Sequence, residues 1–396
     1  MKIDLSIGIN AELCNDSAEK NVQNVAVNYK KEWLEKLWKG NAVYDEVLCF
    51  LYDKDGNIKG GRLLYKPEKI LSVVSQSGET IFVEGQDYIV TEQGIVLTEN
   101  SRIPVAKFDE YCPEIKDESC RWVQAAEYDT RYFLPDGAMF RFQVNVTYTH
   151  TDEWQGVVPE EQAEKLSRVN KKLAEKKPFE ILFYGDSITA GWEASGCDEH
   201  AINVDTVEEM HVRLNHFPYL PAWAELVRSE LSRAYGYDET EGAKVTKINR
   251  AAGGSTADWG VRNAEKLLSP CKPDLAIIGF GMNDNAKDEA VYAGEVEAII
   301  GKIREYSPEA DVILVSPMVP NEDILCFKTG NIGLYEGALR KVAEGLENVA
   351  VAPVNSVFQY LRDRKQYYDL TGNFINHPND FSVRVYAQTV LAVLGV

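Results

Sequence analysis

The chain has 396 residues, a length more typical of two domains than of one. Hydrophobic residues make up 45% and charged residues 26%, which excludes a disordered chain. The formal net charge of −20 gives a surface that repels phosphate backbones and anionic lipid headgroups. We therefore expect neither nucleic acid nor a membrane as a partner, but a neutral small molecule or an oligosaccharide; a homo-oligomer is compatible with the sequence.

The cysteines are odd in number and scattered, and no CxxC pair occurs: Cys14, Cys49, Cys112, Cys120, Cys197, Cys271 and Cys326. This pattern indicates reduced, mostly buried thiols. The N-terminus lacks the apolar run of a secretory signal, and no stretch has the roughly 18 apolar residues of a spanning helix. A cytoplasmic location is therefore predicted, unless a signal peptide precedes the sequence as given.

Residues 1–158 have the composition of a β-rich domain. Strands are expected at Tyr44–Tyr52, Ile70–Val74, Thr80–Val83, Tyr88–Thr91 and Phe140–Tyr148. Turn signals such as Asp55-Gly56 and Glu84-Gly85 separate them. Many short strands at this spacing predict an antiparallel β-sandwich or jelly-roll domain.

Residues 159–177 form a charged stretch with acidic residues first and lysines last, as the helix dipole favours. A helix that links two domains is predicted here.

From residue 178 to 396, strands alternate with helices. Strands are expected at Glu180–Tyr184, Lys244–Ala251, Asp274–Gly279, Asp311–Ser316 and Asn348–Pro353. Helices are expected at Tyr219–Tyr235, Trp259–Leu268, Glu289–Tyr306, Leu334–Leu346 and Phe381–Leu394. Apolar strands of this kind suit a parallel sheet that is buried on both faces. The alternation predicts an α/β fold, a flavodoxin-like doubly wound five-stranded parallel sheet with ligands at the carboxyl ends of its strands.

The segment FYGDSITAGW, residues 183–192, carries the strongest functional signal. An apolar strand runs into Ser187, whose hydroxyl would face the cleft while its N–H could stabilise an oxyanion. A serine that only caps a helix after a strand is the alternative. Position 189 is Thr, so the G-x-S-x-G elbow of α/β-hydrolases is absent.

Three later blocks follow in order: NRAAGGSTADWG (249–260), GFGMNDN (279–285) and NHPND (376–380). Taken singly, they indicate a turn, a loop-capping pair and a helix start. Together with GDS, they resemble the four blocks of the SGNH (GDSL-type) hydrolases, over the whole second half of the chain.

The resemblance implies four catalytic residues. Ser187 would be the nucleophile and one oxyanion donor, Gly254 and Asn283 would supply the other donors, and His377 would be the general base and then the acid. Gly254 is preferred over Gly253 because it lies five residues after Asn249. No cofactor and no metal is implied. A histidine suits the last role because its unperturbed pKa is near 6.5.

The resemblance departs from the family at one position. Many members have Asp three residues before the histidine, where this chain has Phe374. Asn373, Asn376 and Asp369 are near in sequence but do not have that spacing. We therefore expect a Ser–His dyad whose imidazole is oriented by a backbone carbonyl or an Asn; Asp380 could cap the last helix.

The segment Glu193–Phe217 is a candidate lid or wall of the site. Its His200, His211 and His216 match no zinc spacing and are interpreted as solvated rather than metal-binding. Trp192 and Trp259 are candidate aromatic surfaces for substrate, with core packing as the equal alternative.

A β-sandwich in front of an SGNH domain resembles the layout of carbohydrate esterases. Removal of an acetyl group from a sugar ester is therefore the expected function. A lysophospholipase or thioesterase-like short-chain acyl hydrolase and a catalytically decayed carbohydrate-binding protein remain as alternatives.

Overall fold

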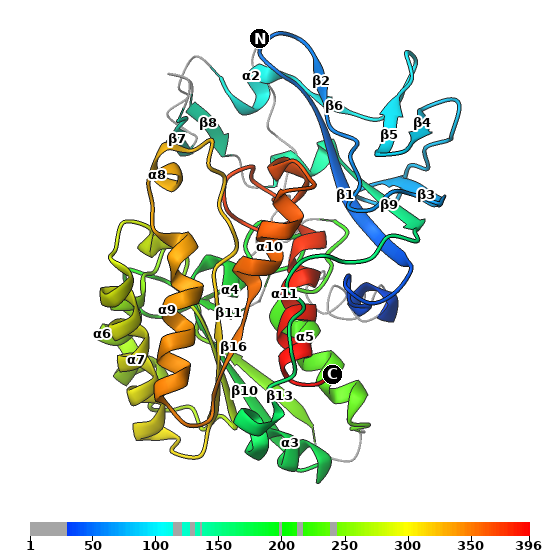
Figure 1. The fold of residues 1–396 in the computed structure, drawn as a ribbon. Helices are drawn as coiled ribbons and strands as arrows, with labels where there is room; N and C mark the ends of the chain where they lie inside the picture. The colour runs from blue at the N-terminus through cyan, green and yellow to red at the C-terminus, as the bar shows by residue number, and fades with distance from the viewer. Residues whose placement is uncertain are drawn as a thin grey trace.

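The computed structural model describes residues 30–113, 121–126, 131–134, 137–197, 200–211, 217–237 and 244–396. Two separate five-stranded sheets lie in the two halves of the chain, one mainly antiparallel and one parallel. In Figure 1 the parallel sheet and its helices occupy the lower part of the view, with the main N-terminal sheet above them on the right.

The N-terminal region, residues 30–158 as far as they are described, holds one main sheet, with two short strand pairs and three short helical segments beside it. Its elements are η1 (Lys31–Leu34), β1 (Ala42–Tyr52), β2 (Ile58–Lys59), β3 (Lys69–Ser75), β4 (Tyr88–Thr91), β5 (Gly94–Leu97), β6 (Val105–Ala106), α2 (Phe108–Tyr111), β7 (Arg121–Gln124), β8 (Arg131–Leu134), η2 (Ala138–Phe142) and β9 (Gln143–Thr149). The strand order is β2-β1-β9-β3, and β6 pairs with β1.

The predicted β-sandwich is not confirmed, because the described residues show one main sheet here rather than two stacked sheets. The strand expected at Thr80–Val83 is also wrong. Only an isolated bridge joins Ile81 to Val74, and the chain has left-handed glycines on either side of it, at Gly78 and Gly85.

Residues 159–177 contain two short helical segments, η3 (Ala163–Leu166) and α3 (Ser167–Ala174). Val169 and Leu173 are buried on the inner face of α3. The backbone N–H of Val169 donates to the Asp311 carboxylate at 3.1 Å, so α3 is attached to the start of a strand of the parallel sheet.

The parallel sheet has the strand order β13-β10-β14-β15-β16. Its strands are β10 (Phe179–Gly185), β13 (Val245–Asn249), β14 (Leu275–Gly279), β15 (Asp311–Val315) and β16 (Val349–Ala352), each within a few residues of its predicted range. Every residue of β15 and β16 is buried, as expected for strands covered on both faces. All neighbouring pairs are parallel, so the carboxyl ends of the strands meet at one edge.

Helices cover both faces of this sheet, with α6, α7 and α9 side by side on the left in Figure 1 and α5 and α11 together on the right. The helices and short strands of this half are α4 (Ser187–Ala190), β11 (His200–Ile202), β12 (Glu209–His211), α5 (Trp223–Ala234), α6 (Ala257–Leu268), η4 (Met282–Asp284), α7 (Glu289–Tyr306), α8 (Leu325–Lys328), α9 (Ile332–Gly345), α10 (Val354–Arg362), η5 (Tyr367–Asp369) and α11 (Asp380–Val393). No helix in the described ranges is both long and apolar enough to cross a membrane.

Helix α11 is buried along its whole length, on the side away from the parallel sheet as well as toward it. The N-terminal region covers that second side. Arg384 donates to the carbonyl of Asp45 at 2.6 Å. The Gln388 amide donates to the Trp33 carbonyl and accepts from the Leu37 N–H. The polar groups of a buried helix need such partners, so the two halves share one interior here.

Candidate active site

Ser187 lies where β10 ends and α4 begins, at the carboxyl edge of the parallel sheet. The Asp186 side chain accepts from the backbone N–H of Ile188 at 3.0 Å and so caps α4. Gly185 precedes it in a position where a Cβ atom would lie 2.3 Å from the Gly279 carbonyl. The tight strand-to-helix turn that presents Ser187 therefore depends on both neighbours.

His377 contacts Ser187 directly. Its Nε2 atom lies 2.7 Å from the Ser187 Oγ atom, although 190 positions separate the two residues in sequence. His377 belongs to the histidine loop, residues 370–379 between η5 and α11. The sequence-predicted nucleophile and base are thus brought within hydrogen-bond distance, the geometry that proton transfer requires.

The other imidazole nitrogen faces an asparagine. The Asn373 Nδ2 atom lies 2.6 Å from the Nδ1 atom of His377. Sequence spacing puts Phe374, not Asn373, at the position of the family's Asp. Phe374 has a left-handed backbone (φ 63°), and this local turn brings a residue four positions before the histidine to the imidazole. The sequence left a backbone carbonyl or an Asn as the group that orients the imidazole, and in the structure an Asn contacts it.

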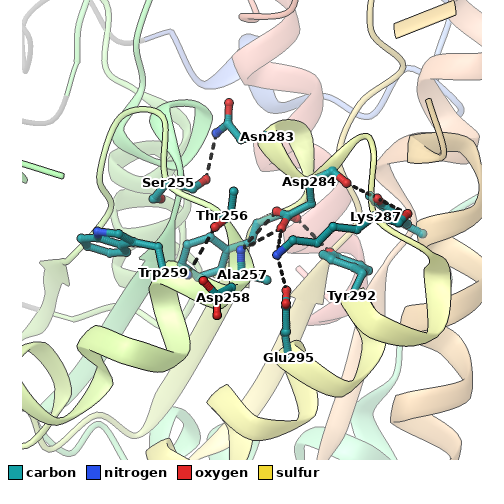
Figure 2. Close-up of polar contacts among 12 residues, drawn as sticks. Ser255, Thr256, Ala257, Asp258, Trp259, Asn283, Asp284, Lys287, Tyr292 and Glu295 are labelled. Carbon is teal, nitrogen blue, oxygen red and sulfur yellow. Dashed lines mark hydrogen bonds and ion pairs between the residues drawn. The ribbon is translucent and has the colours of Figure 1, made fainter. Parts of the chain in front are cut away.

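Gly254 and Asn283 come to the same edge from the loops after β13 and β14. Gly254 has φ +78°, a backbone conformation that glycine adopts without strain, and open space where a Cβ would be. The Asn283 amide nitrogen donates to the Ser255 carbonyl at 2.9 Å (Figure 2). An amide nitrogen carries two hydrogens, so a second N–H of Asn283 can still be donated.

A buried carboxylate joins the loops of Gly254 and Asn283. Figure 2 shows Asp284 reaching the start of α6, where both its oxygens accept from the Ala257 N–H at 3.1 and 3.2 Å. Lys287 lies 2.8 Å from the Asp284 carboxylate and 2.6 Å from that of Glu295. A carboxylate is favourable at a helix N-terminus, so Asp284 holds the loops of Gly254 and Asn283 in a fixed relation.

Two buried carboxylates under the site have perturbed acidity. Burial raises the pKa of Asp186 to about 7, with the nearby charge of Asp284 adding to the effect. Burial also raises the pKa of Asp284, while the Lys287 ammonium opposes that rise. Asp186 therefore titrates close to neutral pH, as buried carboxyl groups do.

Residues 183–382 match the GDSL-like Lipase/Acylhydrolase family, and that match spans half of the chain. The chain belongs to this family. The blocks around Ser187, Gly254, Asn283 and His377, which carry the resemblance to SGNH hydrolases, all lie within the matched residues. No curated protein matches the sequence significantly.

Several solved structures resemble part of this chain. A two-domain esterase active on acetylated mannans shares 20% identity at a TM-score of 0.44, over 61% of this chain and 54% of that one. The acetylxylan esterase Axe2 from Geobacillus stearothermophilus shares 17% at 0.43, over 56% of this chain and 95% of that one. A putative GDSL-like lipase from Parabacteroides merdae shares 16% at 0.41, over 55% and 96%. The chain spans about half the length of the two-domain esterase.

The N-terminal region holds the histidine loop in place, a role that sequence reasoning missed. Gln143 donates to the Thr371 carbonyl at 2.6 Å, and Gln76 donates to the Asp380 carboxylate at 2.7 Å. Phe374 is buried against Tyr111 of α2, with ring centroids 5.9 Å apart. The position that lacks the expected Asp thus anchors the loop in the apolar core of the other half.

Asp380 itself does not cap α11. The cap is Asn379, whose side chain accepts from the Ser382 N–H at 3.1 Å. The Asp380 carboxylate accepts instead from the Ser195 N–H at 2.8 Å, shortly after the turn that carries Ser187. It therefore ties the histidine loop to the chain that follows Ser187.

The two candidate aromatic surfaces have different positions. The Trp192 ring is half-buried with its centroid 6.3 Å from that of His377, and it covers Gly253, where a Cβ would lie 2.3 Å from the indole. Trp259 is buried and donates to the Val204 carbonyl at 2.8 Å, which is core packing. Of these two tryptophans, Trp192 is the one that borders the Ser187–His377 pair.

The histidines of the candidate lid give no described metal site. His200 and His211 occupy paired positions of β11 and β12, and His216 lies outside the described residues, as do 198–199 and 212–215. No group of three metal-ligating side chains occurs within the described ranges.

Proposed function

We propose that this protein is a serine ester hydrolase that removes a short acyl group, in the first instance acetyl, from a carbohydrate. The observation that carries the proposal is the 2.7 Å contact of Ser187 Oγ with His377 Nε2 at the sheet edge where Gly254 and Asn283 also meet. A nucleophile with an adjacent base and preorganised uncharged donors is what acyl transfer requires.

The reaction has two balanced halves. The Ser187 oxygen bonds to the ester carbonyl carbon while its proton passes to Nε2 of His377, and the Ser187, Gly254 and Asn283 N–H groups receive the oxyanion. The C–O bond to the alcohol then breaks as the alcohol takes the proton from Nε2. Water repeats these steps on the acyl-serine, and the acid is released. Each lost oxyanion donor is expected to lower the rate about 10²–10³-fold.

Two features support a neutral sugar ester as the substrate. The net charge of −20 disfavours anionic substrates such as phospholipids. The half-buried Trp192 ring beside His377 offers an aromatic, amphipathic wall of the kind that contacts polar ligands through an apolar face. A binding protein, by contrast, would need no reactive serine.

The test is hydrolysis of p-nitrophenyl esters from acetate to octanoate, followed by acetylated xylo-oligosaccharides, with Ser187→Ala as the control. We expect acetate to be the best of the series and Ser187→Ala to be inactive but folded. Faster cleavage of octanoate would favour the lipid-type alternative. Glycan binding without turnover of any ester would favour the decayed binding protein.

A further inference from the structure

We propose that Asn373 holds His377 in the tautomer that carries its proton on Nε2. The wild-type chain is then a slow esterase, and Asn373→Asp would raise its esterase activity. This inference rests on the proposed ester hydrolysis. Asn373 acts through His377, so it is a positioning residue.

The orientation of the Asn373 amide follows from its partners. Its Oδ1 atom accepts three backbone N–H groups, from Ile375 at 3.0 Å, Asn376 at 3.1 Å and His377 at 3.2 Å. A backbone N–H can only donate, so the atom that faces all three must be the oxygen. Exchanging the two ends of the amide would turn three hydrogen bonds into contacts between donors.

The nitrogen end of the same amide therefore faces the imidazole. Nδ2 lies 2.6 Å from Nδ1 of His377 and 3.3 Å from Oδ1 of Asn376, so both of its hydrogens have an acceptor. Because Nδ2 has hydrogens and no lone pair to offer, Nδ1 of a neutral His377 must be the acceptor. The proton of the ring is then on Nε2, where it points to Ser187 Oγ, 2.7 Å away.

This tautomer is the wrong one for general-base catalysis. Taking the proton of Ser187 requires a lone pair on Nε2 and hence a proton on Nδ1, which would meet the Asn373 N–H directly. In a Ser–His–Asp triad the carboxylate accepts from Nδ1 and selects the reactive tautomer, and replacement of that Asp by Asn lowers kcat about 10⁴-fold. The present chain has the arrangement of such a replacement, built into a loop that fixes the amide.

An aspartate at position 373 would keep the loop and correct the tautomer. One carboxylate oxygen could accept the three backbone N–H groups, as Oδ1 does now, and the other could accept from Nδ1–H. We expect Asn373→Asp to raise kcat/KM for the acetyl ester at least tenfold, with about 10⁴-fold as the upper limit. The carboxylate also stabilises the imidazolium, so the pH–rate profile should move to higher pH.

Asn376→Asp is the matched control, since it adds the same charge one position before His377 without offering an acceptor to Nδ1. No activation is expected from it. The tautomer itself is measured by long-range ¹H–¹⁵N spectra of the imidazole groups at a pH where they are neutral, with the His377 signals assigned by their loss in His377→Gln. Wild type should show protonated Nε2, and Asn373→Asp should show protonated Nδ1.

Activation by Asn373→Asp together with this change of tautomer supports the inference. A wild-type His377 with its proton on Nδ1 overturns it, and this readout needs no substrate and does not depend on the folding of Asn373→Asp. A change of tautomer without activation in an enzyme that hydrolyses esters also overturns it. If neither form hydrolyses an ester, the proposed function fails, while the spectra still decide the tautomer.

Discussion

Replacing Lys365 with Met tests whether the two halves of the chain depend on each other. The side chains of Lys365, Glu46 and Asp369 are all fully buried, and they join β1 of the N-terminal region to the segment just before the histidine loop. The Lys365 ammonium contacts the Glu46 carboxylate and lies 3.6 Å from that of Asp369. Removing it leaves two buried carboxylates without their cation.

The expected loss of unfolding free energy is about 3–5 kcal/mol at pH 8, the usual cost of removing one partner of a buried ion pair. Both carboxylates already accept backbone hydrogen bonds in the wild type. The N–H of Leu64 donates to Glu46 at 2.9 Å, and the N–H of Cys49 donates to Asp369 at 2.7 Å. Lys341→Met is the control, because Lys341 is 72% exposed and pairs with Glu289 at 3.5 Å. Such an exposed pair contributes about 0–1 kcal/mol.

The loss should depend on pH. Burial raises the pKa of Asp369 to about 6 even with Lys365 present, and without that charge it must rise further. The folded variant then binds a proton that the unfolded chain releases near pH 4, so its stability falls by about 1.4 kcal/mol per pH unit as pH rises through this range. The cost of Lys365→Met is therefore smaller at pH 5 than at pH 8.

Urea unfolding of wild type and both variants at pH 5 and pH 8 measures these quantities, and ester hydrolysis below the transition reports the histidine loop. The Asn379 side chain, which caps α11, also donates to the carbonyl of Asp369 at 2.9 Å, so activity should fall with stability. A loss under about 1 kcal/mol, or one equal at both pH values, would refute the reasoning.

Three further predictions concern the site. Asn283→Ala should lower kcat about 10²–10³-fold with little change in KM, measured by steady-state kinetics; a kcat within threefold or so of wild type would remove Asn283 from the oxyanion site. Gly253→Ala should displace Trp192 and raise KM for a sugar ester, because its Cβ would lie 2.3 Å from the indole; an unchanged KM would show that Trp192 is not a substrate wall. Asp186→Asn should flatten the fall in stability between pH 4 and pH 7, on the order of 4 kcal/mol, that follows from the raised Asp186 pKa of about 7. Equal slopes of unfolding free energy against pH in the two proteins would rule out Asp186 as its source.

The second half of the fold could be predicted from sequence because most strands of the parallel sheet are short apolar runs and helical segments alternate with the strands. Phe179–Gly185 and Leu275–Gly279 are buried on both faces, and short apolar runs that alternate with helices favour buried parallel strands. The loops that follow these strands meet at one edge, so the Ser187 and Asn283 blocks could be placed near each other.

The N-terminal sheet was harder to predict, because periodicity does not say what covers a strand's second face. The run Val47–Leu51 is buried throughout rather than at alternate positions. In a sandwich a second sheet would account for that burial, but here η5 and α11 of the other half pack against β1. Lys365 gave no signal at all, since a lysine is rarely fully buried and only the fold brings it to Glu46.

Sequence spacing could not identify Asn373 as the residue that contacts His377, because one backbone conformation changes the number of residues between the two. The left-handed φ of Phe374 adds one residue to the turn and points its side chain into the core with Tyr111 and Tyr368. A bulky residue in this conformation is uncommon, so the sequence pattern favours an extended or helical backbone there. The family's spacing of three therefore becomes four.

The most direct test of the account is where a fluorophosphonate binds covalently, measured by peptide mass spectrometry. This reagent reacts with serines that are activated as nucleophiles. Wild type should carry one adduct, on the peptide that contains Ser187, with none in Ser187→Ala and much slower labelling in His377→Ala. An adduct on another residue, or equal labelling of wild type and Ser187→Ala, would contradict the assignment of Ser187 as nucleophile.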